Sequence, residues 1–193
     1  MNQRVVHFFS IFGVASPILG ILVISISLSL APWFRWDQFA LSNLGGTDDF
    51  GATIFNSGML MTGSLMMLFS ACLLEYTTGN KVGTLGAVIH FLGSICLLGI
   101  GFANINVEPW HWYSALGLFV SMPASTVLIG FFEFQGGKRF FPILALTCTI
   151  ISYSIWLVKW PAIAIPEIIS VLAITFWQIL FALHIRTLTA NTK

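Results

Sequence analysis

Charged side chains are scarce in this sequence. Asp, Glu, Lys and Arg make up 8% of its 193 residues, whereas ordinary soluble domains carry about 25%. Hydrophobic residues make up 57%, and the mean hydropathy is +0.92. Because so few charges cannot cover the surface of a soluble fold, the composition predicts that a lipid bilayer surrounds most of the chain. The net charge of +1 argues against a nucleic-acid partner.

Motifs of known chemistry are absent too. The sequence has no P-loop, no dinucleotide-binding Gly-x-Gly-x-x-Gly and no Gly-x-Ser-x-Gly turn. The three cysteines, Cys72, Cys96 and Cys148, lie inside apolar runs at spacings that match no zinc or redox motif. We interpret them as small buried hydrophobes. The sequence therefore leaves the cofactor and the reaction unassigned.

What the sequence does contain is a series of long apolar runs. A membrane-spanning helix needs about 20 mostly apolar residues, and only helices satisfy every backbone polar group within such a segment. The pattern predicts an all-α integral membrane protein, a bundle of six transmembrane helices in one domain over residues 1–193. The helices are expected at about 7–31, 53–74, 82–103, 113–132, 140–158 and 163–185. The first run is longer than a signal-peptide core, so we expect it to be retained.

Basic residues predict the orientation of this bundle. With the N-terminus in the cytoplasm, six Lys and Arg residues fall on the cytoplasmic side and two, Arg35 and Lys159, on the outer side. We therefore expect a multi-pass protein of the cell membrane with both termini cytoplasmic. Tryptophan is also one-sided, because six of the seven lie at predicted outer ends: Trp33, Trp36, Trp110, Trp112, Trp156 and Trp160.

Polar residues from all three outer loops fall at one membrane level, which predicts a shared pocket mouth. The candidate ligand-binding residues are Ser42, Asn43, Asn56, Asn104, His111 and Glu167. Asn56 lies about one turn inside its helix, too deep for a helix cap, and a buried amide needs a hydrogen bond. Histidine and glutamate are common general acids and bases, so His111 and Glu167 are the catalytic candidates.

Metal binding is a weaker interpretation of the same region. Asp48, Asp49, His111 and Glu167 carry suitable ligand atoms, but no HxxxH or HxxE spacing occurs. Asp48 or Asp49 is equally suited to cap the second helix, and Glu167 follows Pro166 as at a helix start.

A histidine near mid-membrane needs a partner or a cavity. His90 shares a stripe of small residues in the third run with Gly83, Gly86 and Gly93, so this face is expected to point into the bundle. The structural interpretation of His90 is a hydrogen bond to a neighbouring serine or carbonyl. The functional one is a role in a ligand cavity or a proton relay.

The segment PWFRWDQFALSNLGG, residues 32–46, joins the first two runs. Its aromatic first part predicts a short interfacial segment over residues 33–41. Gly45 and Gly46 are then expected to let the chain turn back into the membrane. We predict that Ser42 and Asn43 form one wall of the pocket.

Four motifs, LSNLGG, FNSGMLMTG, EPWHWYSA and IPEIIS, occur in this order along the chain. In these the chain resembles a family of small prokaryotic membrane proteins catalogued as domain of unknown function 998. It more distantly resembles the FRAG/DRAM/SFK group of six-span proteins, which is linked to lipid remodelling. The family pattern commonly reads Ser-Asp-Leu-Gly, whereas Asn43 stands at the second position here. The lost charge weakens a metal site or a nucleophile at this position.

Three functions are compatible with these patterns. The leading hypothesis is a protein that binds or handles a membrane lipid in the outer polar pocket. The first alternative is a membrane-embedded lipid hydrolase or transferase that uses His111 and Glu167, with or without a metal. The second is a non-catalytic subunit that docks a membrane-protein partner through its outer loops.

Overall fold

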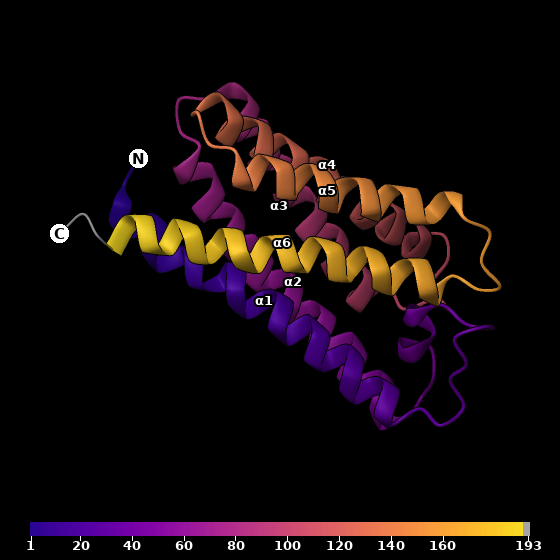
Figure 1. Cartoon of the computed structure of the whole chain (residues 1–193). Helices are drawn as coiled ribbons and strands as arrows, with labels where there is room; N and C mark the ends of the chain where they lie inside the picture. The colour runs from indigo at the N-terminus through magenta and orange to yellow at the C-terminus, as the bar shows by residue number, and fades with distance from the viewer. Residues whose placement is uncertain (191–193) are drawn as a thin grey trace.

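The computed structural model describes residues 1–190, and within them the long elements are all helices (Figure 1). They are α1 (Gln3–Ser29), α2 (Phe50–Tyr76), α3 (Lys81–Phe102), α4 (Trp110–Gln135), α5 (Phe140–Ser154) and α6 (Ala164–Ala190). Two short 3₁₀ helices, η1 (Leu41–Gly45) and η2 (Ile155–Leu157), precede α2 and extend α5. All six expected runs are helical, and each is long and apolar enough to cross a bilayer when η2 is counted with α5. The chain is a multi-pass membrane protein.

The six helices form a closed ring in which each packs against the next and α6 returns to α1. Both ends of the chain lie at one end of the bundle, which we call the terminal end (Figure 1). The opposite end, which we call the loop end, carries η1 and the three longer connections, residues 30–49, 103–109 and 155–163. The loop end is the end for which the sequence predicts the pocket.

Side-chain caps decide where several helices begin. Asp49 accepts a 2.8 Å hydrogen bond from the backbone N–H of Ala52, so α2 begins at Phe50, three residues before the apolar run. Asn80 caps α3 in the same way through the N–H of Gly83, at 2.9 Å. Each cap satisfies one of the N–H groups that a helix start leaves without a partner. The capping interpretation of Asp49 is confirmed.

The small-residue stripe of α3 faces the bundle interior, as expected. Gly83, Gly86, His90 and Gly93 are all buried. A Cβ atom added at Gly86 would lie 3.1 Å from Ile129 of α4, so the missing side chain is what lets the two helices approach closely.

His90 takes part in a buried hydrogen-bond network between four helices. Its Nδ1 lies 2.8 Å from the hydroxyl of Ser70 and its Nε2 lies 3.3 Å from Oε1 of Gln178. The amide nitrogen of Gln178 donates to the Gly13 carbonyl and to Ser16. Because a carbonyl only accepts, the Gly13 contact fixes the amide orientation and makes Nε2 of His90 a donor. The structural interpretation of His90, a hydrogen bond to a neighbouring serine, is confirmed.

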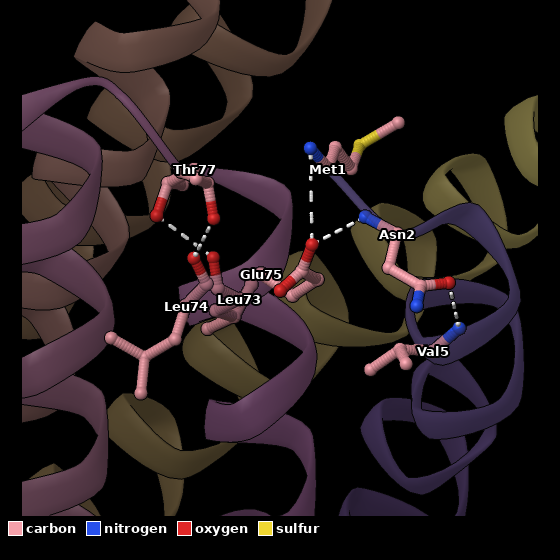
Figure 2. Close-up of polar contacts among 8 residues, drawn as sticks. Met1, Asn2, Val5, Leu73, Leu74, Glu75 and Thr77 are labelled. Atoms are coloured by element: carbon pink, nitrogen blue, oxygen red, sulfur yellow. Dashed lines mark hydrogen bonds and ion pairs between the residues drawn. The ribbon is translucent and has the colours of Figure 1, made fainter.

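The terminal end is held by contacts between distant parts of the chain. Glu75, at the end of α2, pairs with the amino group of Met1 at 3.8 Å and accepts a hydrogen bond from the N–H of Asn2 (Figure 2). The Asn2 side chain in turn accepts from the N–H of Val5 and caps α1 (Figure 2). These contacts hold the start of α1 beside the end of α2.

A buried carboxylate also lies at the terminal end. Glu133 of α4 accepts a 2.7 Å hydrogen bond from the Tyr76 hydroxyl and pairs with Lys138 at 2.8 Å. His184 of α6 lies 4.0 Å from the same carboxylate. This cluster joins α2, α4 and α6, and nothing in the sequence patterns pointed to it, because its members are far apart along the chain.

Candidate functional site

A cavity of about 460 Å³ lies at the loop end, between α4, the end of α5 and the start of α6. Its volume is within the range of ligand-binding pockets, about 300–1,000 Å³. The residues that line it are Ala40, Ser42, Ile105, Glu108, His111, Trp112, Ala115, Leu116, Phe119, Val120, Tyr153, Trp156, Ile163 and Glu167. All three loop-end connections contribute, as the sequence predicted for a shared pocket.

His111 lies in the first turn of α4 and is only 4% exposed. Its Nδ1 lies 2.8 Å from the carbonyl oxygen of Ala103, which can only accept, so Nδ1 carries the proton. No residue of the described chain forms a hydrogen bond with Nε2, and this atom is not among the fully buried ones that lack a partner. Nε2 is therefore not fully enclosed, and in the neutral ring it is an acceptor on a side chain that lines the cavity.

Glu167 lies in the first turn of α6 and is 6% exposed. Its Oε2 accepts a 2.6 Å hydrogen bond from the backbone N–H of Leu41. The other oxygen, Oε1, has no hydrogen-bond partner in residues 1–190 and is not fully enclosed. The carboxylate thus holds the first loop with one oxygen and leaves the other without a partner on a side chain that lines the cavity, rather than only marking a helix start.

The first loop is fixed against α6 by its backbone. The N–H of Ala164 donates to the carbonyl of Phe39 at 3.1 Å, next to the Leu41–Glu167 contact. These contacts place η1 over the bundle, with Leu41 buried and Ser42 at the cavity. Trp33, Phe34 and Phe39 pack edge-on or tilted against one another and cover the preceding turns. The segment therefore contributes Ala40 and Ser42 to the cavity wall, whereas Asn43, predicted for the same wall, does not line the cavity.

Large apolar side chains form the rim of the cavity. Trp112, Leu116, Val120, Tyr153 and Ile163 line it and are all exposed on the outside of the bundle. Because the outside of a transmembrane bundle meets lipid chains, the cavity opens sideways toward the hydrocarbon. Among the polar side chains that line the cavity, those of His111 and Glu167 are the most deeply buried.

Family membership follows from a match over most of the chain. The model of the family described as protein of unknown function (DUF998) matches residues 14–184. The chain belongs to the DUF998 family. No curated protein and no solved structure matches the chain. The likeness to the FRAG/DRAM/SFK group stays an expectation.

The residues that match the DUF998 family include all those that line the cavity. Three of the predicted site residues, however, do not line it. Asn43 caps η1 by accepting from the N–H of Ala40 at 2.7 Å. Asn56 donates from Nδ2 to the Gly45 carbonyl at 2.9 Å. Asn104 accepts from the N–H of Asn106 at 3.1 Å. Each amide holds a loop, so their part in binding a ligand stays a prediction.

The predicted metal ligands are dispersed in this DUF998 member. Asp48 and Asp49 are both exposed, and neither lines the cavity. Within residues 1–190 no group of three or more His, Cys, Asp or Glu side chains is placed to hold a metal ion. The cavity's donor set thus gives no support to a metal centre.

Sequence reasoning missed the aromatic lining of the DUF998 cavity. Phe119, Tyr153 and Trp156 come from positions that helical periodicity marks only as apolar. The sequence placed Trp156 only at a predicted outer end. In the structure its Nε1–H donates to Ser170 at 3.0 Å, and its ring packs on Phe119 with centroids 5.1 Å apart. The excess of tryptophan at this end was the available signal.

A second, smaller cavity of about 100 Å³ lies deeper in the bundle. Phe119 lines both cavities. The smaller cavity is lined mostly by apolar side chains, among them Pro17 of α1 and Pro123 of α4. Gln178 of the His90 network forms part of its wall.

Proposed function

We propose that this protein binds a membrane lipid in the loop-end cavity. The observation that carries the proposal is that two buried side chains, His111 and Glu167, each leave one polar atom without a partner and line a cavity whose exposed lining is largely apolar. A buried polar group without a partner costs free energy, so such atoms favour a ligand that supplies one. A lipid fits both parts, because its headgroup is polar and its chains are apolar.

The orientation of the bundle indicates which leaflet of the membrane supplies this lipid. Of the Lys and Arg residues in the described chain, Arg4, Lys81, Lys138, Arg139 and Arg186 belong to the terminal end. Lys193, which the sequence assigns to the same side, lies outside the described residues. The positive-inside rule then favours a cytoplasmic terminal end and a protein of the cell membrane. In this orientation the cavity takes its lipid from the outer leaflet.

Lipid that co-purifies with the protein tests the proposal. Native mass spectrometry of the protein, extracted from membranes in mild detergent, is expected to show bound lipid. Leu116→Trp fills the rim and is expected to remove it, as is His111→Ala. Leu92→Trp is the matched control, because Leu92 is also exposed but lies on α3 away from the cavity. Equal lipid retention by wild type, Leu116→Trp and His111→Ala would reject the proposal.

A second candidate function, hydrolysis or group transfer on the bound lipid, is favoured by the geometry of His111. The Ala103 carbonyl fixes the tautomer, which leaves Nε2 as a base facing the cavity, as a general base requires. Incubation with defined phospholipids, followed by mass spectrometry of the products, distinguishes the two functions. Binding without products supports lipid handling, whereas product formation that disappears in His111→Ala supports the enzyme.

A further inference from the structure

We propose that the ligand of the loop-end cavity carries a primary amine, as in a phosphatidylethanolamine-type headgroup, and that anionic headgroups are disfavoured. This inference rests on the proposed lipid-binding function and adds the chemical class of the headgroup. It follows from the hydrogen-bonding capacity of the cavity wall and from its charge.

The free polar atoms of the two most deeply buried polar side chains in the cavity lining are acceptors. Oε1 of Glu167 is a carboxylate oxygen, and Nε2 of His111 is the acceptor in the tautomer whose Nδ1 donates to Ala103. Both side chains are more than nine-tenths buried, so their orientation is fixed by the fold. A ligand that satisfies two buried acceptors must bring donors. A primary ammonium group brings three N–H donors and no acceptor.

The side-chain donors of the same wall are largely used inside the protein. The Tyr153 hydroxyl donates to the Val120 carbonyl at 2.7 Å, and the Trp156 indole N–H donates to Ser170 at 3.0 Å. The oxygen atoms of a phosphate are hydrogen-bond acceptors. The free buried atoms of this wall are acceptors as well, so they do not form hydrogen bonds with a phosphate. The Ser42 hydroxyl and the indole N–H of the exposed Trp112 are the side-chain donors that remain.

Charge favours the same ligand. Glu108 and Glu167 line the cavity, and neither Lys nor Arg is among its lining residues. Of the two loop-end cations, Arg35 pairs with Asp37 at 3.2 Å and Lys159 is exposed to the surroundings. A carboxylate in a site of low polarity attracts a cation and repels an anion strongly. Trp112 and Trp156 add aromatic rings, which also attract cations.

The number of N–H groups on the cationic headgroup distinguishes this proposal from a general preference for cations. Phosphatidylcholine carries the same positive charge on a trimethylated nitrogen that has no N–H to donate. If hydrogen bonds to Glu167 and His111 select the headgroup, ethanolamine and choline lipids are bound unequally. If charge or the acyl chain alone selects, they are bound equally.

The test is a competition between lipids with identical acyl chains. Purified full-length protein, stripped of native lipid, is mixed with equimolar phosphatidylethanolamine, phosphatidylcholine and phosphatidylglycerol, and bound species are counted by native mass spectrometry. The ethanolamine lipid is expected to exceed each of the others by about tenfold, the ratio that one charge-assisted hydrogen bond supplies. Glu167→Gln, which keeps the shape but removes the charge, is expected to lower this ratio to near one. Glu75→Gln at the terminal end is the control and keeps the preference.

The outcomes separate the two proposals. Binding of all three lipids without preference, or a preference for the glycerol lipid, overturns the amine inference and leaves lipid binding in place. Binding of none of them overturns both. A preference that Glu167→Gln leaves unchanged also overturns the inference, because the carboxylate would then not select the headgroup. Displacement of the lipid by equimolar free ethanolamine would assign the site to a soluble amine and overturn the lipid source.

Discussion

The backbone N–H of Leu41 and Oε2 of Glu167 are joined by a 2.6 Å hydrogen bond, across 126 positions of sequence. Both residues are buried, so the contact is shielded from water. It holds η1 at the start of α6 and orients the free oxygen of the same carboxylate. The wall of the cavity and its polar end therefore depend on one interaction.

Glu167→Ala removes the acceptor from the Leu41 N–H, and we expect it to lower the free energy of unfolding by about 1–3 kcal/mol, the cost of an unsatisfied buried donor. Glu167→Gln keeps a carbonyl oxygen in place and should cost clearly less. Reversible unfolding in mixed micelles, with an increasing fraction of denaturing detergent, measures both variants. Equal losses for alanine and glutamine would mean that the hydrogen bond is not what stabilises the loop.

Gly45 packs against the side chain of Asn56, and a Cβ at this position would overlap the Asn56 amide and lie 2.9 Å from Phe55. We expect Gly45→Ala to destabilise the protein by about 1–3 kcal/mol, the usual cost of overpacking. Gly136→Ala is the control, since a Cβ there lies 3.4 Å from its nearest neighbour.

The double variant Gly45→Ala/Asn56→Ala examines the cause of this effect. Because Asn56→Ala removes the overlapping amide, part of the loss should be recovered relative to the sum of the single variants. Strict additivity in the unfolding free energies would show that the clash with Asn56 is not responsible.

Gln178→Leu removes the partner of His90 and the donor to the Gly13 carbonyl. Hydrogen bonds between membrane helices contribute about 0.6 kcal/mol each on average and up to about 1.7. We expect a loss of about 1–2 kcal/mol, because more than one such bond is lost. Thr175→Val is the control on the same helix, since the Thr175 hydroxyl donates only within α6. Similar stabilities for the two variants would show that the network contributes nothing.

Lys138 forms the ion pair of the buried Glu133 at the terminal end. Lys138→Met leaves that carboxylate without its cation, and the loss of one partner from a buried pair costs about 3–5 kcal/mol. The Lys138 side chain is 36% exposed, so we expect the lower end of this range or less. Lys81→Met, at an exposed position of the same end, should change stability little. The unfolding assay in mixed micelles measures the stability of both variants. Equal losses for Lys138→Met and Lys81→Met would show that the Lys138–Glu133 pair does not stabilise the protein.

Single cysteines test the orientation of the bundle. In a variant without Cys72, Cys96 and Cys148, Asp48→Cys at the loop end should react in intact cells with a maleimide that does not cross membranes. Thr78→Cys at the terminal end should react only after the cells are opened. Both positions are exposed, so accessibility to the reagent and not burial decides the result. The reverse pattern would place the termini outside the cell.

The helices could be predicted from the sequence because their cause is local. An apolar run in a bilayer has to close its own backbone hydrogen bonds, so runs such as residues 82–103 become helices whatever surrounds them. The caps at Asp49 and Asn80 are local as well, since each bonds a backbone group three residues ahead. The buried face of α3 followed from its period of small residues.

The candidate site was only partly predictable. The sequence placed Ser42, His111 and Glu167 at one membrane level, and these three line the cavity. It grouped Asn56 and Asn104 with them, whereas these amides bond to nearby backbone. Membrane level follows from position along a helix, but the direction of a side chain depends on how that helix is rotated against its neighbours. Rotation is set by packing between segments far apart in the chain.

The sequence by itself thus determined that the protein is a six-helix membrane bundle, because hydrophobicity and backbone hydrogen bonding act within each segment. Only the tertiary structure decided that Glu167 binds the first loop and that the Glu133 cluster joins three helices. It also decided that Phe119 lines two cavities. Those features arise from contacts between helices, whose geometry depends on the joint packing of the whole ring and not on the pattern of any one run.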